Sequence, residues 1–414
     1  MAVDIDITFL GTASAIPSRT RSHSSLALRV DGSIWIFDAG EGTQHQLVRS
    51  DLKLGKIERI FITHLHGDHV FGLPGLLCTV SQKQGARDDA PGDGDSDAVE
   101  DGPTQNNSSS GTVIEIYGPV GTRAFVRNSL RSSCSRLPCR FRVHEFHDNP
   151  ETAESSTEAD LHPEELPGRN QIADSPCGSG AASLWSLDLG VFAVQVVSIA
   201  HTVPSLGYIL QEESAPGNLD VASIQPHLNR NANALKAQGI RNPLSLLAKL
   251  KAGSTVTLPD QTMLVPDDFL SKPTPGRKIV ILGDTHDSMA VAPVCMGATV
   301  VIHEATNACL EQDRQNGASA EEIEVKTIAH GHSTPQMAGR FARAVGAKLL
   351  ILNHFSSRYK GDESPESMLV MDEIRQLALS TYLLPEDPSE PREVITARDL
   401  MTVVVPRRPK RSKS

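Results

Sequence analysis

The sequence lacks the long apolar run, about 18 residues, that a membrane-spanning helix requires. Its first residues, MAVDIDITFLGT, start almost at once with a strand-like alternation, so we expect no signal or transit peptide. Cysteine is scarce as well: 6 cysteines scattered over 414 residues do not form the pattern of a disulfide framework. We therefore expect a protein of a reducing compartment, cytoplasmic or nuclear, without membrane association.

Positive charge is also in short supply, because 39 lysines and arginines face 50 acids and give a net charge of −11. That balance argues against a polyanionic partner only until its distribution is considered. Residues 87–101 carry a net −6 and residues 145–174 a net −8, which leaves +3 for the remainder. Both stretches are polar and poor in groups to bury, so we predict disordered acidic insertions over residues 85–111 and 147–183. The remaining chain is compatible with an anionic substrate.

What the sequence has in abundance is an alternation of strand-like and helix-like runs. Apolar runs such as RKIVIL and AKLLIL read as buried strands, and runs such as STPQMAGRFARAVGA read as helices. This alternation predicts a layered α/β protein. Several strand candidates end in polar clusters: DAGEGT, THLHGDH, AHTVPS, GDTH and NHF, with HEAT and GHST nearby. In such proteins functional groups gather where strand ends meet loops, so we expect these clusters at one edge.

The densest of these clusters, THLHGDH, spans residues 63–69. In its extended part, His64 and His66 point the same way and can chelate one divalent ion. The turn at Gly67 then presents Asp68 and His69 to a second ion. An isolated histidine of this kind would usually be an ordinary polar residue at a strand end, but three histidines and a carboxylate together favour a two-metal site. Such a site needs further ligands, and the strand-end residues that offer them are His201, Asp284 and His354.

These motifs together carry a family resemblance. The segments FLGTASAIPSRTRSHSSLAL, FDAGEGTQHQL, THLHGDHVFGLPGLL, HTVPSLGY, GDT, HEAT, GHST and NHFSSRY run from residue 9 to about residue 360. Their residues and order resemble the short form of the ribonuclease Z family, in the metallo-β-lactamase superfamily. The resemblance implies an α/β fold, a four-layer αβ/βα sandwich, as one catalytic domain over residues 1–405.

The resemblance also implies a cofactor of two Zn²⁺ per subunit, with Mn²⁺ or another divalent ion as an alternative. His64, His66 and His201 would bind the first ion, whereas Asp68, His69 and His354 would bind the second. Asp284 would be shared by both.

The implied reaction is removal of the 3′ trailer from precursor tRNA, leaving a 3′-hydroxyl on the tRNA and a 5′-phosphate on the trailer. Two metal ions lower the pKa of a bridging water and clamp the phosphodiester during hydroxide attack. The resemblance assigns Asp68 as general base. It makes His332 of GHST the candidate proton donor, oriented by Glu304 of HEAT, while His303 is expected to be structural.

A segment over residues 211–275 interrupts the sheet pattern and is predicted to hold two short helices. It resembles the protruding helical arm with which the family grips tRNA, although Asn242-Pro243 stands where the family usually has Gly-Pro. Its candidate RNA-binding residues are Arg230, Lys236, Arg241, Lys249 and Lys251. A solvated helical insertion is the alternative. The family also implies a homodimer in which the arm of one subunit presents RNA to the other subunit.

Two other functions remain open from the sequence. One is a metal-dependent phosphodiesterase acting on small cyclic or diester substrates, and the other is a non-catalytic RNA-binding scaffold. The basic tail, residues 406–414, reads as a nuclear localisation signal, an additional RNA contact or a solvated end.

Overall fold

The structure is a computed structural model that describes residues 4–85, 113–150, 160–177, 182–214, 217–271, 273, 275–383 and 392–405. It separates into two compact units. Unit 1 lies within Val3–Gln211 and Lys278–Arg407, and unit 2 is Glu212–Arg277. The predicted first acidic insertion, from residue 86 on, and the basic tail from residue 406 lie outside the described residues.

The first sheet of unit 1 has the order β19-β1-β2-β3-β4-β5-β6-β7, and β8 also pairs with β6. Its strands β3 to β6 run parallel, whereas β1, β2 and β3 pair antiparallel. The strands are β1 (Ile5–Gly11), β2 (Ser25–Val30), β3 (Ser33–Phe37), β4 (Ile57–Phe61), β5 (Val113–Pro119), β6 (Arg140–His147), β7 (Glu165–Leu166), β8 (Asn170–Ile172) and β19 (Thr402–Val404).

The second sheet has the order β18-β17-β16-β15-β12-β11-β10-β9. Three of its strands, KIVIL, VVIHE and LLILN, are apolar along most of their length because both faces of a parallel sheet are covered. The strands are β9 (Ser175–Cys177), β10 (Ala182–Asp188), β11 (Phe192–Ile199), β12 (Ser205–Glu212), β15 (Lys278–Leu282), β16 (Val300–Glu304), β17 (Leu349–Asn353) and β18 (Glu393–Thr396).

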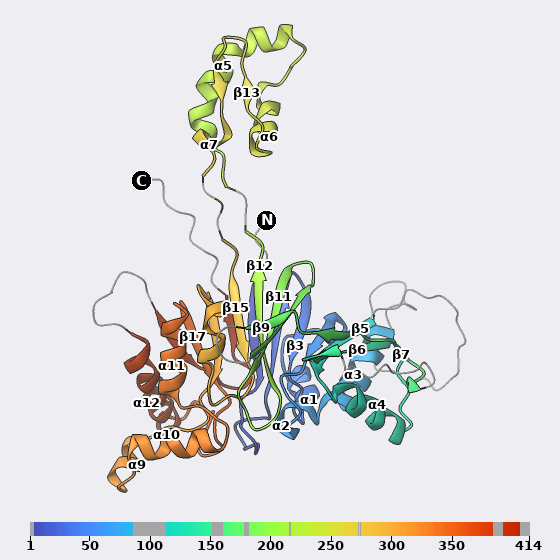
Figure 1. The fold of residues 1–414 in the computed structure, drawn as a ribbon, viewed down its shortest axis with the longest axis vertical. Coiled ribbons are helices and arrows are strands. Elements are labelled where there is room, and N and C mark those ends of the chain that lie inside the picture. The colour runs from blue at the N-terminus through green and yellow to red at the C-terminus, as the bar shows by residue number, and fades with distance from the viewer. Residues whose placement is uncertain are drawn as a thin grey trace. The chain divides into compact units, whose positions relative to one another are not determined.

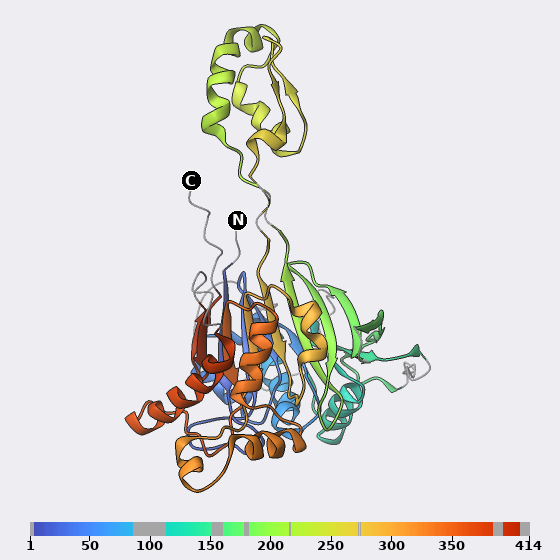
Figure 2. The ribbon, with the colours of Figure 1, turned by 60° about the vertical axis from the view of Figure 1, so that its left-hand side comes forward.

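Helices cover the outer face of each sheet, as Figures 1 and 2 show. The first sheet is covered by α1 (Thr43–Arg49), α3 (Leu73–Gly85) and α4 (Thr122–Ser132), and the second by α11 (Pro335–Ala344) and α12 (Pro365–Tyr382). Helices α11 and α12 begin at the N-caps Thr334 and Ser364, each followed by a proline whose missing N–H costs nothing there. The short helices of unit 1 are α2 (Gly67–Val70), α8 (Ala292–Cys295), α9 (Glu311–Gln315) and α10 (Ala320–Ala329).

Apolar side chains fill the space between the sheets. Phe37 and Phe61 of the first sheet meet Tyr208 of the second, and the rings of Phe61 and Tyr208 lie 5.2 Å apart. Trp35 meets Phe192 of the second sheet, with ring centroids 5.6 Å apart. Two further buried clusters lie between each sheet and its helices. Unit 1 is therefore the predicted αβ/βα sandwich of four layers.

The strand directions bring the polar clusters together. Strands β4, β15, β16 and β17 end at Phe61, Leu282, Glu304 and Asn353. THLHGDH follows β4, Asp284 follows β15, and His354 follows β17. Because parallel strands point their carboxyl ends toward one edge, segments far apart in the sequence converge there.

The prediction of disorder over residues 147–183 is wrong for part of that segment. Residues 160–177 are described and contain β7, β8 and β9. Glu165, only 5% exposed, accepts two hydrogen bonds of 2.8 Å from the guanidinium of Arg127 on α4. Strand pairing holds the backbone of this segment, and the guanidinium of Arg127 neutralises the carboxylate of Glu165. The composition of the segment shows neither interaction.

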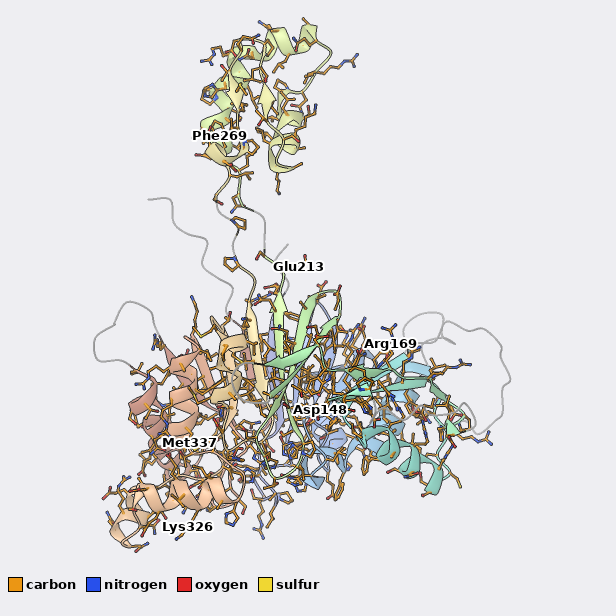
Figure 3. All side chains as sticks on the ribbon, viewed as in Figure 1. Asp148, Arg169, Glu213, Phe269, Lys326 and Met337 are labelled. Atoms are coloured by element: carbon orange, nitrogen blue, oxygen red, sulfur yellow. The ribbon has the colours of Figure 1, made fainter. Side chains whose placement is uncertain are left out.

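Unit 2 has a small core of its own. Its elements are α5 (Val221–Ala237), α6 (Leu246–Lys251), β13 (Val256–Thr257), β14 (Met263–Leu264) and α7 (Pro266–Phe269). Ile224, Leu228 and Leu250 are at most 1% exposed, and Phe269, labelled in Figure 3, packs against their cluster.

Candidate metal centre

All seven predicted metal ligands lie in one place at the edge of unit 1. They fall into overlapping groups whose donor atoms lie within 4.8 Å of one another. The groups are His64, His66 and His201; His64, His69 and Asp284; Asp68, His69 and His354; and Asp284, His332 and His354. The segment after β4, which includes α2, supplies four of the seven predicted ligands, and the loops after β11, β15 and β17 supply one each. His332, the eighth residue of these groups, follows α10.

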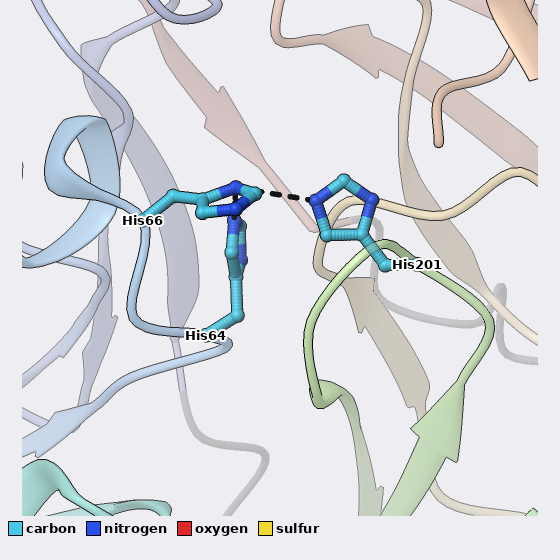
Figure 4. A group of neighbouring side chains, drawn as sticks. All are labelled: His64, His66 and His201. Atoms are coloured by element: carbon cyan, nitrogen blue, oxygen red, sulfur yellow. Dashed lines mark hydrogen bonds between the residues drawn. The ribbon is translucent and has the colours of Figure 1, made fainter. Parts of the chain in front are cut away.

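The first group is a triangle of imidazoles, drawn in Figure 4. His64 and His66 come from one loop, and His201 approaches from the loop after β11. Nε2 of His64 lies 3.2 Å from Nδ1 of His66, and Nε2 of His201 lies 3.3 Å from the same atom. Three nitrogen donors therefore face one point.

The second group lies beside the first. Nε2 of His69 is 3.0 Å from Nε2 of His354, and Oδ2 of Asp68 is 3.3 Å from that same His354 nitrogen. Between the groups lies Asp284, 3% exposed, whose Oδ2 is 3.7 Å from Nε2 of His64 and 3.5 Å from Nε2 of His69. Burial alone would raise the pKa of Asp284, but the positive fields of His354 and His69 hold it well below its usual range. Asp284 is thus a carboxylate shared between both groups.

The outer ring nitrogens fix which nitrogens face inward. Nδ1 of His69 lies 2.7 Å from Asp38, and Nδ1 of His201 lies 2.7 Å from the carbonyl oxygen of Gly331, so both nitrogens donate outward. Nδ1 of His64 donates to Thr63 (3.0 Å), whose own hydroxyl donates to Asp38. In the neutral rings of His64, His69 and His201, the Nε2 lone pair therefore faces inward, toward the other ligand-type atoms. Histidine ligands of metals are oriented in this way, and the donor set fits divalent zinc.

Asp38 is a functional residue that the sequence reasoning missed. Its side chain, 5% exposed, accepts the Nδ1 proton of His69 and the backbone N–H of Thr63 at 2.7 Å each. The segment DAGEGT was noticed only as a strand-end cluster. Its position directly after a buried strand is the signal that could have identified it.

Gly331 has a role that only a residue without a side chain can fill. Its φ of +85° is in the left-handed region, and a Cβ there would lie 2.8 Å from Nδ1 of His201. The absence of a side chain lets its carbonyl come close enough to accept from His201.

His332 and Glu304 meet next to the metal ligands. Nδ1 of His332 lies 3.1 Å from Oε2 of Glu304, which is 2% exposed. Burial lowers the pKa of His332, but the carboxylate of Glu304 more than compensates and raises it to about 9. Thr306 links this pair to His354: its hydroxyl donates to Glu304 (2.6 Å) and lies 3.1 Å from Nδ1 of His354. The candidate proton donor His332 is therefore held beside the predicted ligands.

A backbone N–H group fixes the side chain of Asp68. The N–H of Ala15 donates to its Oδ2 at 2.7 Å, and Ala15 has a φ of 56°.

His303, expected to be structural, is fully buried and bonded to Ser288 (3.0 Å) and to the backbone oxygen of Glu304 (2.8 Å). These contacts agree with the expectation that His303 has a structural role.

The candidate RNA-binding residues belong to unit 2. Arg230 and Lys236 lie on α5, Lys249 and Lys251 on α6, and Arg241 in the connection between the helices; all five are exposed. Arg230 forms an ion pair of 2.9 Å with Asp260, an acid beyond the stretch considered from sequence. The other four are the stronger candidates for phosphate contacts.

Among the helices of the described residues, none combines the length and apolar character needed to cross a bilayer.

Known proteins resemble this chain along almost its whole length. A family model for the anti-Pycsar protein Apyc1 matches residues 5–89. The human zinc phosphodiesterase ELAC protein 1 is 38% identical, covering 98% of this chain and 99% of its own. A ribonuclease Z of Streptococcus suis is 35% identical over 86% of this chain and 90% of its own. The crystal structure of human tRNase Z, short form, aligns with a TM-score of 0.56 and 31% identity, covering 97% of this chain and 99% of that one.

Proposed function

Because the chain belongs to the ribonuclease Z family and has the metallo-β-lactamase fold, we propose that it is a zinc-dependent endoribonuclease that removes the 3′ trailer from precursor tRNA. The observation that carries this proposal is the convergence of seven ligand-type side chains from four separate segments of the chain, with their donor atoms facing one another. A scaffold protein without catalysis would have no need of such a centre.

Two zinc ions would be held by side chains of unit 1. His64, His66 and His201 would hold one, and Asp68, His69 and His354 the other. Asp284 would bridge them, since its carboxylate faces both groups. When bound, the ions supply Lewis acidity that lowers the pKa of a water and stabilises negative charge on the phosphate.

The remaining steps belong to side chains of this chain. Asp68 accepts the proton of the attacking water, with its other oxygen fixed by the N–H of Ala15. His332 gives a proton to the 3′-oxygen that leaves, and Glu304 keeps the Nδ1 proton of the ring pointed at itself so that Nε2 faces the substrate. The products are a tRNA with a 3′-hydroxyl and a trailer with a 5′-phosphate.

Incubation with a precursor tRNA tests this function. We expect one cut, immediately 3′ of the discriminator nucleotide, that requires divalent metal and leaves a ligatable 5′-phosphate on the trailer. Gel mapping of both labelled ends would measure it. An absence of cleavage by protein that holds two ions per chain would contradict the proposal.

We further propose that unit 2 binds the tRNA body through Lys236, Arg241, Lys249 and Lys251, and that two subunits pair so that one subunit's unit 2 serves the other's metal centre. The exposed cations of unit 2 support the first part. Phosphate contacts position RNA without reading its sequence, as an enzyme for many tRNAs requires. The proposed substrate also supports a cytoplasmic or nuclear location.

Mixing two inactive proteins tests the pairing. One lacks unit 2 and the other carries Asp284→Asn in the metal centre. We expect the mixture to recover precursor cleavage after subunit exchange, because a mixed dimer contains one intact centre and one unit 2 from the opposite chain. Cleavage by neither protein alone is the control. A mixture that stays inactive, while sedimentation shows mixed dimers, would exclude pairing in trans.

A further inference from the structure

A pocket of about 400 Å³ is lined in part by His332. Helix α10 forms one wall, and the segments that follow β16 and β17 form the other. Figure 3 labels Lys326 on α10. The residues that the argument uses are Thr306, Asn307, Ile323, Thr327, His332 and Arg358. Pockets that bind small molecules have volumes of about 300–1,000 Å³, so this one is large enough for a nucleoside.

The polar side of the pocket is held rigid. Nδ2 of Asn307 donates to Thr327 (3.3 Å), and Oδ1 of Asn307 accepts from the hydroxyl of Tyr359 (3.2 Å). Thr327 in turn donates to the backbone oxygen of Ile323 (2.6 Å). Amide and hydroxyl groups fixed in this way can accept and donate to ribose hydroxyls and to base edges without being ordered on binding.

Arg358 gives the pocket a cationic side. Its guanidinium is fixed by two hydrogen bonds to Asp313 (2.9 and 3.0 Å), and it lies over the ring of Tyr359 at 4.7 Å. A planar guanidinium can stack on a base, and the ion pair with Asp313 holds that of Arg358 in place. Ile323, on α10, adds an apolar surface that a base can cover.

The chemistry of the reaction indicates which nucleotide of the substrate lies beside this pocket. Cleavage that leaves a 3′-hydroxyl breaks the bond between phosphorus and the 3′-oxygen of the upstream nucleotide. That oxygen needs the proton of His332, so its ribose must lie beside His332. In-line displacement places the attacking water on the opposite face of the phosphorus. The upstream nucleotide therefore lies on the His332 side of the phosphate, and this pocket is the space that His332 itself lines.

We propose that the pocket beside α10 is the subsite for the nucleotide on the 5′ side of the cut, and that it helps to select where the enzyme cleaves. The proposal rests on the proposed endoribonuclease function and adds to it the position of one substrate nucleotide. It gives Asn307, Ile323, Thr327 and Arg358 a role in binding and leaves proton transfer to His332.

Filling the pocket tests the subsite. In the variant Ile323→Trp, an indole would occupy the space of the base, and Ile323 is only partly buried, so the helix tolerates it. We expect kcat/KM for precursor tRNA to fall at least about tenfold, while the zinc content per chain stays as in the wild type. Val325→Trp is the matched control, because Val325 lies on the same helix, is 60% exposed and does not line the pocket. Unchanged precursor kinetics in Ile323→Trp would overturn the proposal.

Binding of the trinucleotide rAAA, which ends in a free 3′-hydroxyl, separates the subsite from the function. In calorimetry of the zinc-loaded full-length protein, we expect binding to the wild type and to Val325→Trp, and affinity at least about tenfold weaker for Ile323→Trp. If the wild type fails to cut precursor but this difference is present, the proposed function fails and the nucleotide pocket stands. If the wild type cuts precursor and all three proteins bind rAAA equally, the pocket fails and the function stands. Absence of rAAA binding to the wild type would also overturn the subsite.

Discussion

The variant Asp284→Asn is expected to lose at least about 1,000-fold in kcat and to retain fewer than two zinc ions per chain. Asp284 is the carboxylate that faces both ligand groups, 3.7 Å from His64 and 3.5 Å from His69. Asparagine keeps the shape but removes the negative charge that balances two dications. The amide nitrogen that replaces one carboxylate oxygen can donate a hydrogen bond but cannot bind a metal ion.

Zinc content by mass spectrometry and hydrolysis of bis(p-nitrophenyl) phosphate measure the two effects of Asp284→Asn separately. The matched control is Asp287→Asn, an exposed carboxylate in the same loop that accepts from the backbone N–H of Met289 (2.8 Å). We expect that control to keep both ions and nearly full activity. Wild-type metal content and rate in Asp284→Asn would show that the shared carboxylate is not part of a metal centre.

Removal of unit 2 is expected to reduce precursor tRNA cleavage by about 100-fold or more, because the loss of several phosphate contacts weakens binding of the whole substrate. Hydrolysis of bis(p-nitrophenyl) phosphate should remain within about twofold of wild type, since that substrate makes no distant phosphate contacts. Residues 213–276 would be replaced by a short glycine-serine linker. The ends can be joined because Gln211 and Lys278 are paired neighbours in β12 and β15.

A milder variant identifies the charges as the cause. Replacing Arg241, Lys249 and Lys251 with alanine leaves the buried core of unit 2 untouched, because all three are exposed. We expect weaker precursor binding. We also expect a shallower slope of log affinity against log salt concentration, because about three fewer phosphate contacts release counterions. Unchanged precursor cleavage after deletion of unit 2 would contradict the proposed role of unit 2 in binding the tRNA.

The convergence of the predicted metal ligands could be foreseen from the sequence because each is a polar residue that follows a buried strand within a few positions. His64 and His66 have chelate spacing within one loop, and the apolar runs before Asp284 and His354 mark them as strand ends. Parallel strands deliver such residues to one edge, whatever their separation in sequence. The alternation of strands and helices predicted a layered α/β protein, and the family resemblance supplied the four-layer order.

Other features depend on contacts that no local pattern encodes. Asp38 orients His69 from 31 positions away in the sequence, and only the fold brings the two together. The carbonyl of Gly331 reaches His201 across 130 positions. Composition also misled over residues 160–177, where the guanidinium of Arg127 on another element neutralises Glu165. Contacts with residues distant in the sequence order that segment, and a local stretch of sequence does not show them.

Anomalous diffraction from zinc-loaded crystals of the full chain tests the central claim most directly. We predict two zinc peaks per chain: one ligated by His64, His66 and His201, the other by Asp68, His69 and His354, with Asp284 contacting both. A single peak at full zinc occupancy, or peaks ligated by other side chains, would contradict the account.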